Sequence, residues 1–189
     1  MSDREKNSIG EVRMFLAFLF SIVGESESQA IKEVFRLAEI LSVTAGDNVR
    51  AEKMNRQGST IVIVLDGLVS GFLARQTNHR TDIWLGKTRS VLINDGSLQN
   101  LEAFNIEAIE DSLLMLISKE KLEVICQTYP VLNRLFAEFI FPATIKSLEY
   151  HSILNKIDHP ANKFSYFKRA FPKVWYSVPI RIYNSYVGN

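Results

Sequence analysis

The residues best suited to metal binding or nucleophilic chemistry are few and widely spaced. The three histidines, His79, His151 and His159, show no H-x-H or H-x-x-x-H spacing. Enzymes with a cupin-type jelly roll cluster His and Glu ligands on neighbouring strands. Cys126 has no histidine near it in the sequence, and neither a G-x-S-x-G nor a phosphate-binding glycine motif occurs. We therefore predict no catalytic residue, no metal site and no cofactor.

The stretch "NDGSLQN" offers hydrogen-bonding groups of another kind. Its neutral polar side chains, at a predicted turn and helix start, are those of Asn94, Ser97, Gln99 and Asn100. A solvated surface loop is the favoured interpretation of this stretch, and the alternative is that these side chains bind the polar part of a small ligand. Lys87 and Arg89 precede them in "KTRSV", which alternates like a strand whose polar side faces water.

Composition sets limits on the class of protein. The chain has 189 residues, 47% of them hydrophobic, and a formal net charge of +1. This describes an ordinary globular chain without a global electrostatic attraction to nucleic acid. The lone Cys126 cannot form an intrachain disulfide, which favours a cytoplasmic location. The apolar run "MFLAFLFSIV" is about half the length that a membrane span needs, so we predict a buried helix.

Periodicity divides the chain into a helical start, a strand-rich middle and a helical end. Residues 10 to about 39 repeat apolar positions at helical spacing, with Ser26 or Ser28 able to cap after "GESES". From Leu41 to Ser118, short β-branched runs alternate with Gly, Asn and Asp turns. We therefore expect an α+β fold with a β-roll or jelly roll of about eight strands.

The helical end contains one long apolar helix. Ser118 is placed to cap "KEKLEVICQTY", and Pro130 to start the next helix, with a kink at Pro142. The apolar face of that helix is too broad for solvent, so it lies on the roll or pairs with a second copy. We favour a homodimer through this helix, and the predicted interface residues are Leu132, Phe136, Phe139, Ala143 and Tyr150.

This order of elements resembles the cyclic-AMP receptor protein and FNR (Crp/Fnr) family of bacterial transcription regulators. The "DGLV" turn between two apolar strands, and "IEAIEDSLLMLISKEKLEVI" leading into "YPVLNRLF", carry the resemblance. The tail "ANKFSYFKRAFPKVWYSVPIRIYNSYVGN" is similar to the first helices of the family's winged helix-turn-helix domain. The resemblance implies a cyclic-nucleotide-binding-like roll, a dimerisation helix and regulation of transcription.

The tail resembles only part of the family's DNA-binding domain. Gly188 corresponds to the turn glycine after which the recognition helix follows in the family, and the sequence stops one residue later. DNA is therefore an expected partner only if further C-terminal residues exist. In the alternative interpretation, the tail is an aromatic-rich helix that closes a core.

The phosphate-binding cassette departs from the family pattern. In the family, an arginine pairs with the nucleotide phosphate and a Gly-Glu pair holds the ribose. With "FNIEA" as the following strand, the arginine position falls at or near Glu102, and no Gly-Glu pair lies between Trp84 and Ala103. Glu102 and Phe104 complete the candidate ligand-binding set with Asn94, Ser97, Gln99 and Asn100. Because a carboxylate repels a phosphodiester, the resemblance implies a pocket that is degenerate for cyclic AMP.

We predict three parts: a roll domain with N-terminal helices over residues 1–128, a dimerisation helix over 129–157, and a partial winged-helix-like tail over 158–189. The predicted function is that of a Crp/Fnr-like regulatory protein with an unidentified small-molecule effector. The first alternative is the effector-binding portion of a DNA-binding regulator, and the second is a cupin-like enzyme.

Overall fold

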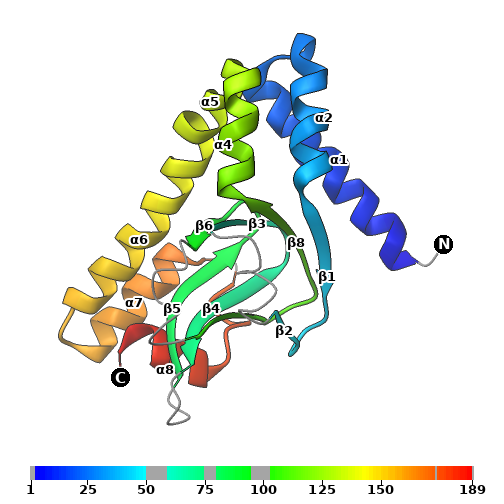
Figure 1. The fold of residues 1–189 in the computed structure, drawn as a ribbon. Helices are drawn as coiled ribbons and strands as arrows, with labels where there is room; N and C mark the ends of the chain where they lie inside the picture. The colour runs from blue at the N-terminus through cyan, green and yellow to red at the C-terminus, as the bar shows by residue number, and fades with distance from the viewer. Residues whose placement is uncertain (1–2, 50–58, 75–79, 95–102, 173, 189) are drawn as a thin grey trace.

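The computed structural model describes residues 3–49, 59–74, 80–94, 103–172 and 174–188. In this part of the chain, two four-stranded antiparallel sheets face each other, in the orders β1-β8-β3-β6 and β2-β7-β4-β5. Helices precede and follow the roll, and α1, α2 and α4 stand over one end of it (Figure 1). The fold is α+β with a β-roll, as the sequence predicts.

The strands form where β-branched runs alternate with turn residues. They are β1 (Glu39–Val43), β2 (Asn48–Val49), β3 (Thr60–Asp66), β4 (Leu68–Ala74), β5 (Arg80–Lys87), β6 (Val91–Asn94), β7 (Ala103–Ala108) and β8 (Ser112–Ser118). The "DGLV" turn joins β3 to β4, and "FNIEA" lies in β7, both as predicted.

Helical segments lie on both sides of the roll in sequence. Before it come α1 (Asp3–Val23), the 3₁₀ turn η1 (Glu25–Glu27) and α2 (Ser28–Leu37); after it come α4 (Lys119–Thr128), η2 (Pro130–Leu132), α5 (Asn133–Leu135), the π turn η3 (Phe136–Ile140), α6 (Phe141–Lys156), α7 (Pro160–Ala170) and α8 (Ile180–Val187). None of the helices in the described ranges is long and apolar enough to cross a membrane.

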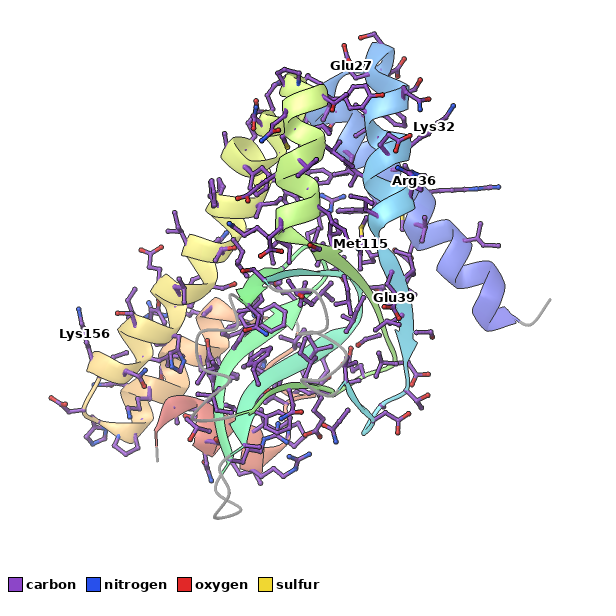
Figure 2. The ribbon with its side chains drawn as sticks, in the orientation of Figure 1. Glu27, Lys32, Arg36, Glu39, Met115 and Lys156 are labelled. Atoms are coloured by element: carbon purple, nitrogen blue, oxygen red, sulfur yellow. The ribbon has the colours of Figure 1, made fainter. Side chains whose placement is uncertain are left out.

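Strand β3 is apolar at consecutive positions because both of its faces are buried. Ile61 and Ile63 point towards the helices, whereas Val62 and Val64 point into the interior between the two sheets. Met115 of β8 lies on the helix side, where the roll meets α2 and α4 (Figure 2). The roll therefore separates two apolar cores, one under the helices and one between its sheets.

Helix α1 covers the start of the long helix. As a result, three of the predicted interface residues lie in the core of their own chain. The ring centroids of Phe15 and Phe18 lie 6.0 and 5.0 Å from that of Phe139. Leu132, Phe136 and Phe139 are 0%, 9% and 6% exposed and belong to the intrachain core. Their prediction as interface residues was wrong because the contact with the N-terminal helix joins residues far apart in the sequence.

One of the predicted helix caps is confirmed and one is wrong. The Oγ atom of Ser118 accepts a hydrogen bond from the backbone N–H of Lys121 at 3.2 Å, which caps α4. At α2 the N-cap residue is Glu27, which makes no side-chain capping bond. Neither Ser26 nor Ser28 caps this helix, because Ser26 lies within η1 and Ser28 already belongs to α2.

Proline positions shape the long helix. Pro130 stands at the first position of η2, as predicted, where its missing N–H costs nothing. The π turn η3 immediately precedes Pro142, where the sequence predicts a kink, and in it the N–H of Phe141 donates to the carbonyl of Phe136. A proline inside a helix cannot donate to the preceding turn, and a π turn accommodates that loss.

The tail shares a core with the roll and α6. Phe167 and Ile182 are 1% and 0% exposed and pack with Leu68, Leu85 and Leu154. Figure 1 shows α7 and α8 beside the lower ends of β5 and α6. Helix α8 ends at Val187, and the C-cap residue Gly188 has a φ of 71°, the left-handed turn that the family resemblance implies.

Candidate functional site

The described residues include only part of the predicted ligand-binding set. Asn94 ends β6, half-buried and in register with Thr60 of β3. Phe104 lies in β7 and is buried between the sheets. The other predicted ligand residues, Ser97, Gln99, Asn100 and Glu102, lie outside the described residues.

Two aromatic side chains fill the interior of the roll. Trp84 of β5 is 3% exposed and Phe104 is 6% exposed, and both pack among the valines of this core. A Cβ atom on Gly71 would lie 2.7 Å from Cζ of Phe104, and the Trp84 ring covers the position where Gly86 lacks a side chain. Glycine is therefore needed at both positions because the aromatic rings approach the backbone closely. The sequence analysis did not identify Trp84 as a site residue.

The indole N–H of Trp84 is a buried hydrogen-bond donor. Its Nε1 atom has no hydrogen-bond partner among the described residues. An unsatisfied buried donor costs about 1–3 kcal/mol, which offsets part of the stabilisation that burial of the indole ring provides. The Trp84 ring therefore belongs to the apolar core between the two sheets.

A second polar arrangement lies on the outer face of the β2-β7-β4-β5 sheet, and we call it the polar clasp. It consists of Ser70, Arg80, Asp82, Glu107, Arg181 and Ser185. Arg80 donates from Nη2 and Nε to the two oxygens of Asp82 at 2.6 and 2.9 Å, and from Nη1 to Glu107. Its guanidinium carbon also lies 3.8 Å from the centre of the Phe72 ring. Asp82 and Glu107, both buried, are thus neutralised by charge-assisted hydrogen bonds.

The polar clasp fastens α8 to the roll. Arg181 of α8 donates two hydrogen bonds to the Glu107 carboxylate, one of them at 3.1 Å. The hydroxyl of Ser185 accepts from the backbone N–H of Asp82 at 2.8 Å and donates to the carbonyl of Arg80 at 3.3 Å. Helix α8 therefore docks through paired charges as well as through its apolar face.

Acid is expected to weaken the polar clasp through Glu107. Despite the opposing effect of burial, hydrogen bonds from Arg181 and Arg80 hold the pKa of Glu107 below its usual value of 4.5. A carboxyl group with a lowered folded-state pKa stabilises the fold above its unfolded pKa, and this contribution is lost as pH falls through the folded-state pKa.

In urea titrations, the stability difference between the wild type and Glu107→Gln should shrink as pH falls below 4.5. The exposed Glu110→Gln variant is the control, and a Glu107→Gln difference that does not change with pH contradicts this assignment.

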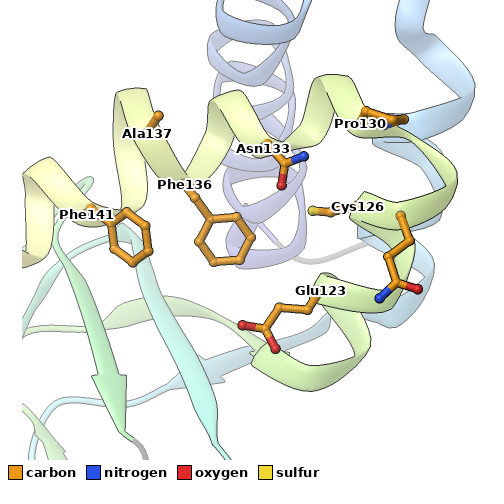
Figure 3. A pocket seen from close by; sticks show the side chains of 8 residues that line it. Glu123, Cys126, Pro130, Asn133, Phe136, Ala137 and Phe141 are labelled. Atoms are coloured by element: carbon orange, nitrogen blue, oxygen red, sulfur yellow. The ribbon is translucent and has the colours of Figure 1, made fainter.

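An open apolar groove lies between α4 and the start of the long helix. Its volume is about 590 Å³, and its lining includes Glu123, Cys126, Gln127, Asn133, Phe136 and Phe141. Figure 3 shows Phe136 and Phe141 on the long-helix side, opposite Glu123 on α4. Burial, with the nearby Glu123 carboxylate, raises the pKa of the Cys126 thiol, so the groove does not contain an activated nucleophile.

The histidines in the described ranges have structural contacts. The His151 ring lies 4.6 Å from that of Tyr186, and burial lowers the pKa of His151. His159 caps α7 by accepting from the backbone N–H of Ala161 at 3.3 Å. Within the described ranges, no group of three or more His, Cys, Asp or Glu side chains could hold a metal ion.

Comparisons with known proteins identify the fold. The sequence matches no protein-family model and no curated protein. A CooA variant from Carboxydothermus hydrogenoformans matches with a TM-score of 0.52 and 13% identity over 79% of this chain and 92% of that chain. FixK2 from Bradyrhizobium japonicum matches with a TM-score of 0.56 and 15% identity over 80% of this chain and 77% of that chain. Both are Crp/Fnr family regulators.

The chain has a Crp/Fnr-type fold. The resemblance that the sequence suggests is confirmed at this level, since these identities establish shared architecture rather than shared chemistry. Within this Crp/Fnr-type fold, the roll interior contains Trp84 and Phe104, and the last two helices are fastened to the outside of the roll.

Proposed function

We propose that this protein is a homodimeric Crp/Fnr-like regulatory protein whose roll does not respond to cyclic AMP. The observation that supports this function best is the filled roll interior: Trp84 and Phe104 are buried between the two sheets of a fold used by regulators. A nucleotide placed there would displace both rings and leave their packing energy unreplaced. We also propose that the protein is cytoplasmic and responds to a small-molecule effector other than a cyclic nucleotide. We propose that it is not an enzyme.

Cyclic AMP at millimolar concentration is expected to leave the melting temperature of this protein unchanged. A ligand at a hundred times its Kd adds about 2.7 kcal/mol of stability, which is easily seen in a thermal scan of a chain of this size. The control is the same scan with sodium chloride at equal ionic strength. A saturable rise of several degrees with cyclic AMP, absent with sodium chloride, would overturn this part of the proposal.

The surface of α6 supports the homodimer. Phe141, Ile145 and Leu148 are 47%, 63% and 59% exposed, and they recur at steps of four and three, so they form one exposed stripe. Ala143 and Tyr150, which the sequence analysis assigned to the interface, are half-buried against the cores of their own chain. The stripe adjoins the open groove at Phe141. An exposed apolar surface of this kind favours association, and a two-fold partner covers stripe with stripe.

Leu148→Asp is expected to convert the dimer into a monomer in analytical ultracentrifugation at tens of micromolar. The new charge would be buried opposite its own copy, which costs several kcal/mol across a two-fold interface. Ile180→Asp is the matched control, because Ile180 is also an exposed apolar residue, at 70%, but lies on α8. If the wild type sediments as a monomer, or if Ile180→Asp dissociates the dimer equally, α6 is not the interface.

Three basic residues of the tail make contacts within the chain, which supports a role in the sensor rather than on DNA. Lys163 is 8% exposed and donates from Nζ to the carbonyl of Val187 at 2.7 Å. Arg181 pairs with Glu107, and Lys168 lies 4.3 Å from the centre of the Trp175 ring. Phosphate contacts require free cations on one surface. We therefore propose that residues 160–187 complete the sensor and do not form a DNA-reading surface.

A further inference from the structure

A small cationic pocket lies between the β5–β6 turn and α6. Its volume is about 200 Å³, and its polar lining comes from Lys87, Thr88, Arg89, Ser90, Lys146 and Ser147. Tyr150 and Phe171 form an aromatic wall, with ring centroids 5.8 Å apart. The pocket thus joins three parts of the fold: the roll, the long helix and the tail.

The pocket has a strong charge imbalance. Lys87, Arg89 and Lys146 bring three positive charges, and no described carboxylate lines it. The Arg89 guanidinium lies 4.7 Å from the centre of the Phe18 ring, and the Lys146 ammonium lies 5.9 Å from that of Tyr150. An aromatic face positions a cation but is not a counter-ion, and Phe18 itself is not among the lining residues of the pocket.

Hydroxyl donors accompany the cations. The Oγ atom of Ser90 accepts from the backbone N–H of Lys87 at 3.0 Å, which leaves its own proton for another acceptor. Ser147 projects from α6 into the same pocket. Thr88 contacts the Asp66 carboxylate at 3.4 Å, and Asp66 is not among the lining residues. Cations with hydroxyl donors around a small volume suit an oxyanion.

Arg89 is in an unfavourable backbone conformation. Its φ is 68°, and among the described residues it is the one non-glycine residue with a positive φ. Two backbone hydrogen bonds hold the turn against β3. The N–H of Arg89 donates to the carbonyl of Val64 at 2.8 Å, and the carbonyl of Ser90 accepts from the N–H of Val64 at 3.0 Å. Glycine adopts this conformation without strain, so an arginine here is best explained by the use of its side chain.

We propose that this cationic pocket binds the phosphate group of a small metabolite. Arg89 contacts the phosphate oxygens from the β5–β6 turn and Lys146 from α6, with Ser90 and Ser147 as neutral donors. Drug-sized ligands occupy about 300–1,000 Å³, so a pocket of about 200 Å³ fits a phosphate with few further atoms. Because Arg89 belongs to the roll and Lys146 to α6, the bound anion ties the sensor to the helix that we propose as the dimer interface. This inference rests on the proposed regulatory function.

Calorimetric and thermal titrations of the whole chain with sodium phosphate and with phenyl phosphate, at constant ionic strength, test the pocket. We expect saturable binding by the wild type, weakened at least tenfold in both Arg89→Gly and Lys146→Gln. Arg89→Gly should melt no lower than the wild type without ligand, since glycine relieves the backbone strain. Lys156→Gln, which removes an exposed cation from the far end of α6 (Figure 2), should bind as the wild type does.

The outcomes separate the pocket from the proposed function. Tighter binding of phenyl phosphate than of inorganic phosphate identifies an ester as the ligand class, and the reverse order identifies free phosphate. Absence of saturable binding, or equal binding by Arg89→Gly, Lys146→Gln and the wild type, overturns the pocket and leaves the proposed dimer untouched. Specific phosphate binding by a chain that is monomeric at tens of micromolar supports the pocket and contradicts the proposed regulatory dimer.

Discussion

Replacing Trp84 with alanine should lower the free energy of unfolding by about 3–5 kcal/mol, as large aromatic-to-alanine changes in packed cores do. Trp84 is 3% exposed and lies against Phe104 and the glycine at position 86. Removal of the indole opens a cavity in a core that is bounded by two sheets and cannot collapse easily. Denaturant titration by circular dichroism measures the change.

The cavity left by Trp84→Ala should bind indole. An engineered apolar cavity stays dry and takes up apolar molecules of matching shape. Added indole should raise the melting temperature of Trp84→Ala and not that of Trp175→Ala, which removes a half-buried tryptophan from the tail. A mild stability loss in Trp84→Ala, or an equal response of both variants to indole, is incompatible with an indole between the sheets.

Phe167→Ala is expected to cost about 3–5 kcal/mol and to lower the melting temperature of the whole chain in a single transition. The Phe167 ring lies 5.0 and 5.1 Å from the rings of Phe171 and Tyr183, within the core that joins the tail to Leu68 and Leu85. Loss of this ring therefore weakens the roll as well as the tail.

Phe164→Ala is the matched control for Phe167→Ala. Phe164 is on the same helix but is 42% exposed, so its removal should cost well under half as much. Calorimetry would disprove a shared core if Phe167→Ala produced two separate transitions, one for the tail and one for an unchanged roll. Equal effects of the two variants would show that α7 does not pack as described.

The sequence predicts the fold well because its periodicities are strong. The apolar runs of β3 and β8 and the cap at Ser118 each identify their element without knowledge of distant residues. Which helix covers which face is a different matter. The sequence shows that the face of Phe136 and Phe139 must be covered, and only the tertiary structure shows that α1 covers it.

Trp84 was not predicted because a β-bulge changes the face to which it points. Arg80 and Asp82 point outwards into the polar clasp, and a strict period of two would place Trp84 with them. The pairing of β4 with β5 shifts between Gly71 and Phe72, which turns Trp84 inwards.

Neither the polar clasp nor the cationic pocket could be predicted from local sequence patterns. Arg181 lies 74 positions from its partner Glu107, and Ser185 lies 103 positions from Asp82. In the sequence, Arg181 resembles one more basic residue of a DNA-binding tail. In the sequence, Lys87 and Arg89 look like residues on the solvent-exposed side of a strand. Only the tertiary structure shows that α6 places Lys146 in the same pocket.

The central claim is that an indole, not a nucleotide site, occupies the interior of this Crp/Fnr-type roll. The sequence contains two tryptophans, so Trp175→Phe leaves Trp84 as the sole indole fluorophore. We predict blue-shifted emission for this variant, because Trp84 is buried and its N–H has no described acceptor. Quenching by acrylamide should be weak, and millimolar cyclic AMP should leave the spectrum unchanged. Emission typical of a water-exposed indole, strong quenching, or a saturable spectral change with cyclic AMP would contradict the claim.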